Sequence, residues 1–86
     1  SDEEFPCDRR LIAMVISKAF NQRRKKLRTS LKTPPKRVSR ISGWHSSRWK
    51  EALASLSHES RLDARPEELD FDDWIDFCTD LEKFGN

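Results

Sequence analysis

The chain is 86 residues long and carries 17 Lys and Arg against 15 Asp and Glu, so its formal net charge is +2. Three Trp and five Phe can anchor the core of one small domain, but a domain of this size rarely encloses a deep catalytic cleft. The two glycines are too few for a glycine-rich nucleotide-binding loop, and no apolar run is long enough to predict a membrane span. The acidic residues 1–4 are not typical of a signal peptide, so we expect a cytoplasmic protein.

The small net charge conceals an uneven distribution. Residues 1–50 have a net charge of +10, whereas residues 51–86 have a net charge of −8. Within the basic half, residues 18–50 contain twelve Lys or Arg and no Asp or Glu. Such asymmetry is typical of a chain whose basic half binds a polyanion.

The chain contains two cysteines, Cys7 and Cys78, which we expect to be free thiols in a reducing compartment. Together with His45 and His58 they supply four possible metal ligands. No two of these four residues have the short spacing that a structural zinc site requires. We therefore predict no metal site.

The first predicted element is a helix that begins after Asp8, whose side chain can cap it. Its apolar residues recur at steps of three, four and seven, which places them on one helical face. These residues are Leu11, Ile12, Val15, Ile16, Ala19, Phe20, Leu27 and Leu31. Thr33-Pro34-Pro35 ends the pattern, because proline cannot donate to the helical hydrogen bonds. We predict one helix of about 25 residues, with an apolar first half and a basic second half.

A basic loop follows, and a second helix is predicted to begin at Ser46 or Ser47, either of which can cap it. Pro66 fits the first position of a short helical turn. The last predicted helix is capped by Asp70 and stopped by Gly85. Its core-facing stripe is Trp74, Phe77, Cys78, Leu81 and Phe84. No segment alternates with a period of two, so the predicted fold is all-α: a small helical domain with one long N-terminal helix and two to three further short helices.

The clearest functional signal lies in the basic half of the first helix and in the loop after it. On a continuous helix Arg24, Arg28 and Lys32 fall on one line, four residues apart. No carboxylate is close in sequence, so these cations repel one another unless a partner neutralises them, and the guanidinium fork suits phosphate oxygens. The predicted nucleic-acid-binding residues are Arg23, Arg24, Lys25, Arg28, Lys32, Lys36, Arg37 and Arg40.

Other interpretations of these features remain open. The cations can form a solvated face or pair with the acidic half of the chain. Trp44 and Trp49 are predicted to be core residues rather than stacking platforms for bases. Four aspartates are predicted to lie on the solvent face of the last helix: Asp72, Asp73, Asp76 and Asp80. Nothing in the sequence indicates the burial that would perturb the pKa of a catalytic carboxylate. The sequence therefore predicts a binding module and no enzyme site.

The run Phe20-Asn21-Gln22-Arg23-Arg24-Lys25-Lys26-Leu27-Arg28-Thr29-Ser30-Leu31 resembles the signature that opens the C-terminal domain of the KsgA-type rRNA adenine N6,N6-dimethyltransferases. That signature is an aromatic residue, a polar pair, Arg-Arg-Lys, a leucine and a closing Ser-Leu or Ala-Leu. The stretch from Arg65 to Trp74 is similar to the family's Arg-x-Glu-x-Leu turn and last helix. The resemblance extends from about Leu11 to Phe84, but residues 33–44 are more basic and richer in proline than a short connector requires.

Members of this family transfer methyl groups from S-adenosylmethionine to two adjacent adenines near the 3′ end of small-subunit rRNA during ribosome assembly. The resemblance implies that residues 1–86 form a single helical rRNA-binding domain, separated from the catalytic domain that binds the cofactor, and that this fragment does not catalyse. It implies a docking role for Arg23, Arg24 and Lys25, whereas the roles of the other cations rest on charge and position. The expected partner is small-subunit rRNA or the ribosomal subunit, bound by a monomer.

Two other functions are compatible with the sequence. The first is that of a helical DNA-binding domain in a transcription factor related to the same enzymes. The second is that of a protein-interaction module that binds a basic partner through its acidic last helix.

Overall fold

The computed structural model of the protein describes residues 5–84, and these fold into helices joined by short connections. The four α-helices are α1 (Arg9–Phe20), α2 (Leu27–Ser30), α3 (Ser46–Ser55) and α4 (Phe71–Lys83). Three short 3-10 helices lie between them: η2 (Val38–Arg40), η3 (Ser60–Asp63) and η4 (Pro66–Glu68). No strand occurs among residues 5–84, so the predicted all-α class is confirmed.

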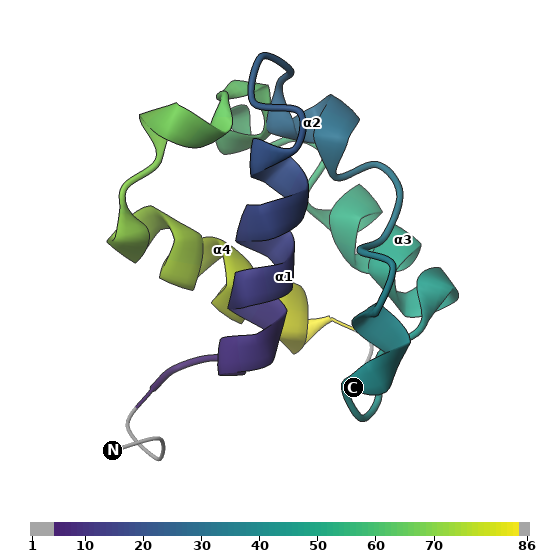
Figure 1. Ribbon diagram of the computed structural model, residues 1–86. Coiled ribbons are helices and arrows are strands. Elements are labelled where there is room, and N and C mark those ends of the chain that lie inside the picture. The colour runs from purple at the N-terminus through teal and green to yellow at the C-terminus, as the bar shows by residue number, and fades with distance from the viewer. Residues whose placement is uncertain (1–4, 85–86) are drawn as a thin grey trace.

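The helices pack around one apolar core. α1 packs against α4 and η4, and α3 packs against α4. Figure 1 shows α1 crossing α4. Trp44 and Trp49 are both buried, with ring centres 6.2 Å apart, so their assignment to the core is confirmed. The indole Nε1 of Trp49 donates to the backbone oxygen of Leu31 at 2.9 Å. This bond ties α3 to the end of α2, close to the basic part of the chain.

The first helix is much shorter than predicted. α1 ends at Phe20, and residues 21–26 form a turn before α2 begins at Leu27. The buried residues of α1 are Leu11, Ile12, Val15 and Ala19. A continuous helix would extend this face through Gln22 and Lys26, whose polar side chains are costly to bury. The turn instead lets Leu27 enter the core, where its backbone N–H donates to the oxygen of Ala64 at 2.9 Å.

α3 begins at Ser46, but its cap is His45 and not a serine. His45 has an extended backbone, and its Nδ1 accepts a hydrogen bond from the backbone N–H of Arg48 at 3.2 Å. Ser46 is already helical, so it cannot take the capping position. The prediction of a serine cap was therefore wrong by one residue.

α4 has the cap that the sequence predicted. The carboxylate of Asp70 accepts from the backbone N–H of Asp73 at 2.8 Å, and Asp73 accepts in return from the N–H of Asp70 at 3.0 Å. The buried stripe consists of Trp74, Phe77, Cys78 and Leu81. Phe84 follows the helix as its C-cap and is half-buried, whereas the predicted stop at Gly85 lies outside the described residues. Pro66 occupies the first position of η4, as predicted.

Candidate nucleic-acid interface

The turn between α1 and α2, which we call the basic turn (residues 21–26), presents a run of cations to solvent. Arg23, Arg24, Lys25 and Lys26 are all exposed. The first three form no salt bridge with any residue that the structure describes. Because α1 stops at Phe20, the expected line of Arg24 with later cations on one helix does not form. The basic turn is instead a separate projection at one end of α1 (Figure 1).

The backbone of the basic turn is held in place by a segment about forty residues later in the sequence. Arg65 Nε donates to the backbone oxygen of Arg24 at 2.8 Å, next to the bond between Leu27 and Ala64. Within the turn, the N–H of Lys25 donates to the oxygen of Gln22 at 2.9 Å. These interactions use main-chain atoms of the turn and of Leu27 directly after it, so the cationic side chains of the turn remain available. A backbone that is already ordered lowers the entropic cost of binding.

Arg28, in contrast, has partners inside the molecule. Its Nε donates to Asp63 Oδ1 at 3.0 Å, and its Nη1 donates to the backbone oxygen of Ser57 at 2.8 Å. The hydrogen bond from Arg28 is the main reason why the pKa of the Asp63 carboxyl lies below its ordinary value. For Arg28, the alternative that cations of the basic half pair with the acidic half is therefore confirmed.

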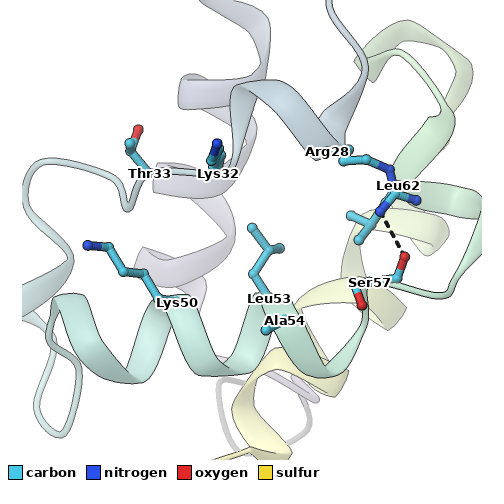
Figure 2. A pocket seen from close by; sticks show the side chains of 8 residues that line it. All are labelled: Arg28, Lys32, Thr33, Lys50, Leu53, Ala54, Ser57 and Leu62. Carbon is cyan, nitrogen blue, oxygen red and sulfur yellow. Dashed lines mark hydrogen bonds between the residues drawn. The ribbon is translucent and has the colours of Figure 1, made fainter.

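A groove of about 650 Å³ lies between α2 and α3, and we call it the α2–α3 groove. It has a cationic rim and an aliphatic floor, with no carboxylate in its lining. The rim cations are Arg28, Lys32 and Lys50, and the apolar residues are Leu53, Ala54 and Leu62. Figure 2 shows Lys32 and Lys50 toward one end of the groove and Arg28 at the other. Lys32 and Lys50 come from segments that are distant in sequence, so only the fold brings them together.

A second cavity, of about 480 Å³, lies between α1 and the segment that follows α2. Its cations are Lys18 from α1 and Lys36 and Arg37 from the later segment. Arg40, in η2, is exposed and lines neither cavity. The predicted cations are thus divided among the basic turn, two cavities and one isolated position. Lys18 and Lys50 were missed, although the stretch of residues 18–50 without any carboxylate contains both.

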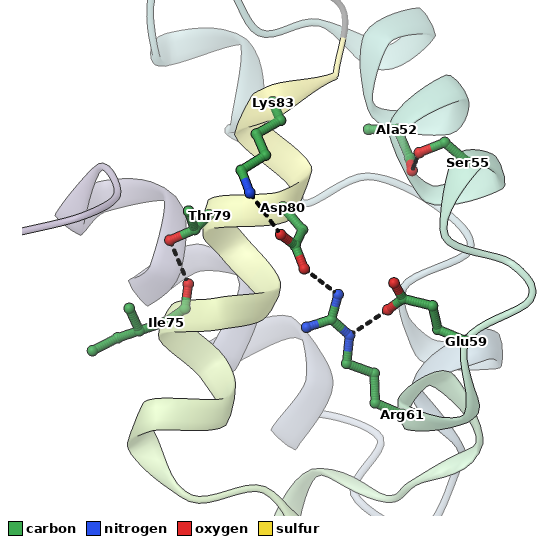
Figure 3. A network of polar contacts seen from close by, with 8 residues as sticks. All are labelled: Ala52, Ser55, Glu59, Arg61, Ile75, Thr79, Asp80 and Lys83. Carbon is green, nitrogen blue, oxygen red and sulfur yellow. Dashed lines mark hydrogen bonds and ion pairs between the residues drawn. The ribbon is translucent and has the colours of Figure 1, made fainter.

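The acidic face of α4 is smaller than predicted, because Asp80 is half-buried and engaged (Figure 3). Its carboxylate pairs with Arg61 at 2.5 Å and with Lys83 at 3.4 Å, and Arg61 also donates to Glu59 at 2.6 Å. Burial raises the pKa of Asp80, but the hydrogen bonds and charges of Arg61 and Lys83 outweigh burial and hold the pKa below its ordinary value. Asp73 is occupied by the capping box. The aspartates of α4 that are exposed and outside these interactions are Asp72 and Asp76.

Other kinds of site were also sought in the described part of the chain. No three His, Cys, Asp or Glu side chains among residues 5–84 are grouped so that they could hold a metal ion. Cys7 and Cys78 are buried free thiols, and burial raises the pKa of both. None of the described helices combines the length and the apolar character needed to cross a bilayer.

Comparison with known proteins points to one kind of relative. A protein named ribosomal RNA small subunit methyltransferase A from Bradyrhizobium diazoefficiens is 41% identical over 54 residues, which cover 59% of this chain and 19% of the relative. Proteins of the same name from two strains of Rhodopseudomonas palustris are 44% identical over 52 residues (57% of this chain, 18% of the relative) and 42% identical over 55 residues (60% and 19%). The chain therefore spans about a fifth of the length of these relatives. No family model and no solved structure matches it. The resemblance to the rRNA methyltransferases is confirmed.

Proposed function

Because the chain is similar in sequence to ribosomal RNA small subunit methyltransferases A, we propose that it is the RNA-docking, C-terminal domain of such an enzyme. Its proposed partner is the rRNA of the small ribosomal subunit. The observation that carries the proposal is the basic turn, in which Arg23, Arg24 and Lys25 are exposed and form no salt bridge among the described residues.

RNA phosphates are the partner that best fits this arrangement. An Arg guanidinium can donate to two phosphate oxygens at once, and a polyanion removes the repulsion between neighbouring cations. Lys18, Lys36 and Arg37 extend the positive surface along the second cavity. The deep groove of A-form RNA is closed to side chains, so the domain recognises the shape and charge of the RNA rather than its sequence.

In this proposal, methyl transfer from S-adenosylmethionine to two adjacent adenines takes place in another domain of the parent enzyme. We infer that this chain does not itself hold that cofactor, because a Rossmann-type site uses a glycine-rich turn and the chain contains two glycines. Gly43, the glycine that the structure describes, has a φ of +85° and lies in a tight turn, where an added Cβ would be 3.2 Å from Arg48 Nη1. The domain contributes docking and orientation, and we assign it no catalytic step.

The test compares two double variants that change the net charge equally. Arg23→Glu/Lys25→Glu reverses the basic turn, and Arg10→Glu/Lys83→Glu reverses two exposed cations outside it. In filter binding to a small-subunit rRNA fragment, the first variant is expected to bind at least about tenfold more weakly than the wild type, and the second within about threefold. Equal weakening by both variants would show that only the total charge matters and would refute docking by the basic turn. Duplex DNA that competes as well as rRNA would indicate the DNA-binding alternative.

One observation favours a second function, the binding of a basic protein by α4. The side chain of Phe71 is 55% exposed next to the exposed Asp72, and its ring centre lies 6.4 Å from that of Phe5. Aromatic side chains are enriched at protein-binding surfaces, and the neighbouring carboxylate is complementary to a basic partner. The test is the binding of purified ribosomal proteins to the immobilised chain after nuclease treatment. Binding to the wild type that is lost in the Phe71→Ser variant would support this function.

A further inference from the structure

We propose that the α2–α3 groove binds one unpaired nucleotide of the docked RNA, with the base on the aliphatic floor and the phosphate between Lys32 and Lys50. This inference rests on the proposed RNA-docking function and assigns a subsite within it. A nucleotide combines a flat, largely apolar base with an anionic group, and the groove offers separate surfaces for these two parts.

The size and floor of the groove suit the base. Its volume of about 650 Å³ falls within the usual range of small-ligand pockets, roughly 300–1,000 Å³. Leu53 and Ala54 of α3 and Leu62 of η3 supply the apolar surface. Leu53 and Leu62 are core residues of which only a small part is exposed in the groove, so the floor is firm. A firm apolar depression of this kind gains free energy when a flat group displaces water from it.

The charge of the groove is unequal along its length. Lys32 and Lys50 form no salt bridge with any described residue, so one end of the groove is positive. At the other end the charge of Arg28 is largely balanced by Asp63 at 3.0 Å. The bonds from Nε and Nη1 of Arg28 restrict the plane of its guanidinium, and guanidinium planes stack on nucleic-acid bases. The groove thus has an anion-binding end and an end suited to the base.

The occupant must be unpaired, because a base within a duplex has both faces covered by its neighbours in the stack. The position of the groove favours RNA over an acidic peptide. α2 begins directly after the basic turn, and Arg28 and Lys32 follow that turn within a few residues. A strand held by the basic turn therefore has an adjacent nucleotide within reach of the groove.

The test fills the groove without disturbing the core. Ala54 is exposed on α3, so Ala54→Trp places an indole in the groove, and Ser55→Trp places the same group on a neighbouring exposed face of α3 that does not line it. Affinities are measured for a single-stranded RNA of about ten nucleotides and for a duplex of the same length. Ala54→Trp is expected to weaken single-strand binding about tenfold and to leave duplex binding within about twofold, whereas Ser55→Trp changes neither. Lys32→Ala/Lys50→Ala should produce the same selective loss.

A second readout needs no folded RNA. Uridine and adenosine 5′-monophosphates are titrated into methyl-labelled wild-type chain, and the signals of Leu53, Ala54 and Leu62 are expected to shift. If these signals stay fixed, or if Ala54→Trp affects both RNA forms equally or neither, the subsite does not exist. If the subsite fails these tests but the Arg23→Glu/Lys25→Glu variant still loses duplex binding, the proposed docking function stands without the subsite. An acidic peptide that shifts the same signals when the nucleotides do not would overturn the inference in favour of a protein partner.

Discussion

Replacing Arg48 with methionine is expected to destabilise the fold strongly, because this buried cation joins three parts of the chain. Its Nε donates to the backbone oxygen of Phe84 at 2.9 Å, its Nη1 to that of Gly43 at 3.0 Å, and its Nη2 to that of Glu82 at 3.1 Å. The guanidinium carbon also lies 3.9 Å from the centre of the Trp44 ring. Arg48 thereby fastens the C-terminal end of α4 to the start of α3.

The size of the effect follows from these contacts. Hydrogen bonds from a charged donor contribute about 1.5–3 kcal/mol each, and a desolvated cation–π contact adds about 2 kcal/mol. Removing the guanidinium from water costs several kcal/mol, which offsets much of that gain. Methionine keeps the aliphatic stem but leaves three carbonyl oxygens without a donor. We expect a net loss of about 3 kcal/mol in the free energy of unfolding, which for a domain of this size lowers Tm by roughly 12–24 °C.

Urea unfolding followed by circular dichroism measures this loss. The control is Arg10→Met, since Arg10 is exposed and its ion pair with Asp8 is screened by solvent, so less than about 1 kcal/mol should be lost. Arg48→Lys, which retains the charge but not the planar fork, should lie between the two. A loss below about 1 kcal/mol for Arg48→Met, or one equal to that of the control, would refute the role assigned to Arg48.

Three further predictions test other parts of the structure. In urea unfolding, Arg28→Ala should lower the free energy of unfolding by only about 1 kcal/mol, because the ion pair of Arg28 with Asp63 is exposed. A loss no larger than that of Arg24→Ala would contradict a stabilising role for this ion pair. A hydrogen bond from the Arg10 side chain holds the pKa of Asp8 below its unfolded value. The stability that this bond supplies is therefore present above about pH 4 and is lost as the pH falls through the lowered pKa. Asp8→Asn keeps a cap, so in thermal unfolding its Tm should fall less on acidification than that of the wild type. Burial raises the pKa of Cys7 and Cys78, so a thiol reagent at about pH 8 should label neither cysteine in the native protein and both in denaturant. Rapid labelling of the native protein would show that the cysteines are not buried.

The features that the sequence predicted well depend on neighbouring residues alone. The cap at Asp70 and the helical spacing of Trp74, Phe77 and Leu81 are both contained within α4. Pro66 likewise determines the start of η4 through its own fixed backbone angle. Such local signals are sufficient to identify an all-α domain.

The end of α1 is harder to predict, because neither glycine nor proline marks it. The pattern placed Phe20 on the core face together with Leu27, but Phe20 is 43% exposed. After the turn Leu27 enters the core, where its N–H donates to the oxygen of Ala64, a residue far along the sequence that no local pattern can reveal. The burial of Arg48 has the same origin, since its acceptors include the distant Glu82 and Phe84.

For the candidate interface, the sequence identified exposed cations but not their grouping. Arg23, Arg24 and Lys25 lie in the basic turn and form no salt bridge with any described residue, although the sequence left open that they pair with the acidic half. The pairing of Arg28 with Asp63 and the approach of Lys50 to the groove both require the tertiary fold. A charge pattern alone cannot distinguish a cation that binds a partner from one that holds the protein together.

RNA docking by the basic turn is tested most directly by the salt dependence of RNA binding. Each cation that contacts a phosphate contributes about 0.7–0.9 to the slope of log K against log salt concentration, because binding releases condensed counterions. For Arg23→Ala/Lys25→Ala we expect a slope that is shallower than that of the wild type by about 1.5, whereas Arg10→Ala/Lys83→Ala leaves it unchanged. Parallel lines for the wild type and the Arg23→Ala/Lys25→Ala variant would show that the basic turn does not contact the RNA.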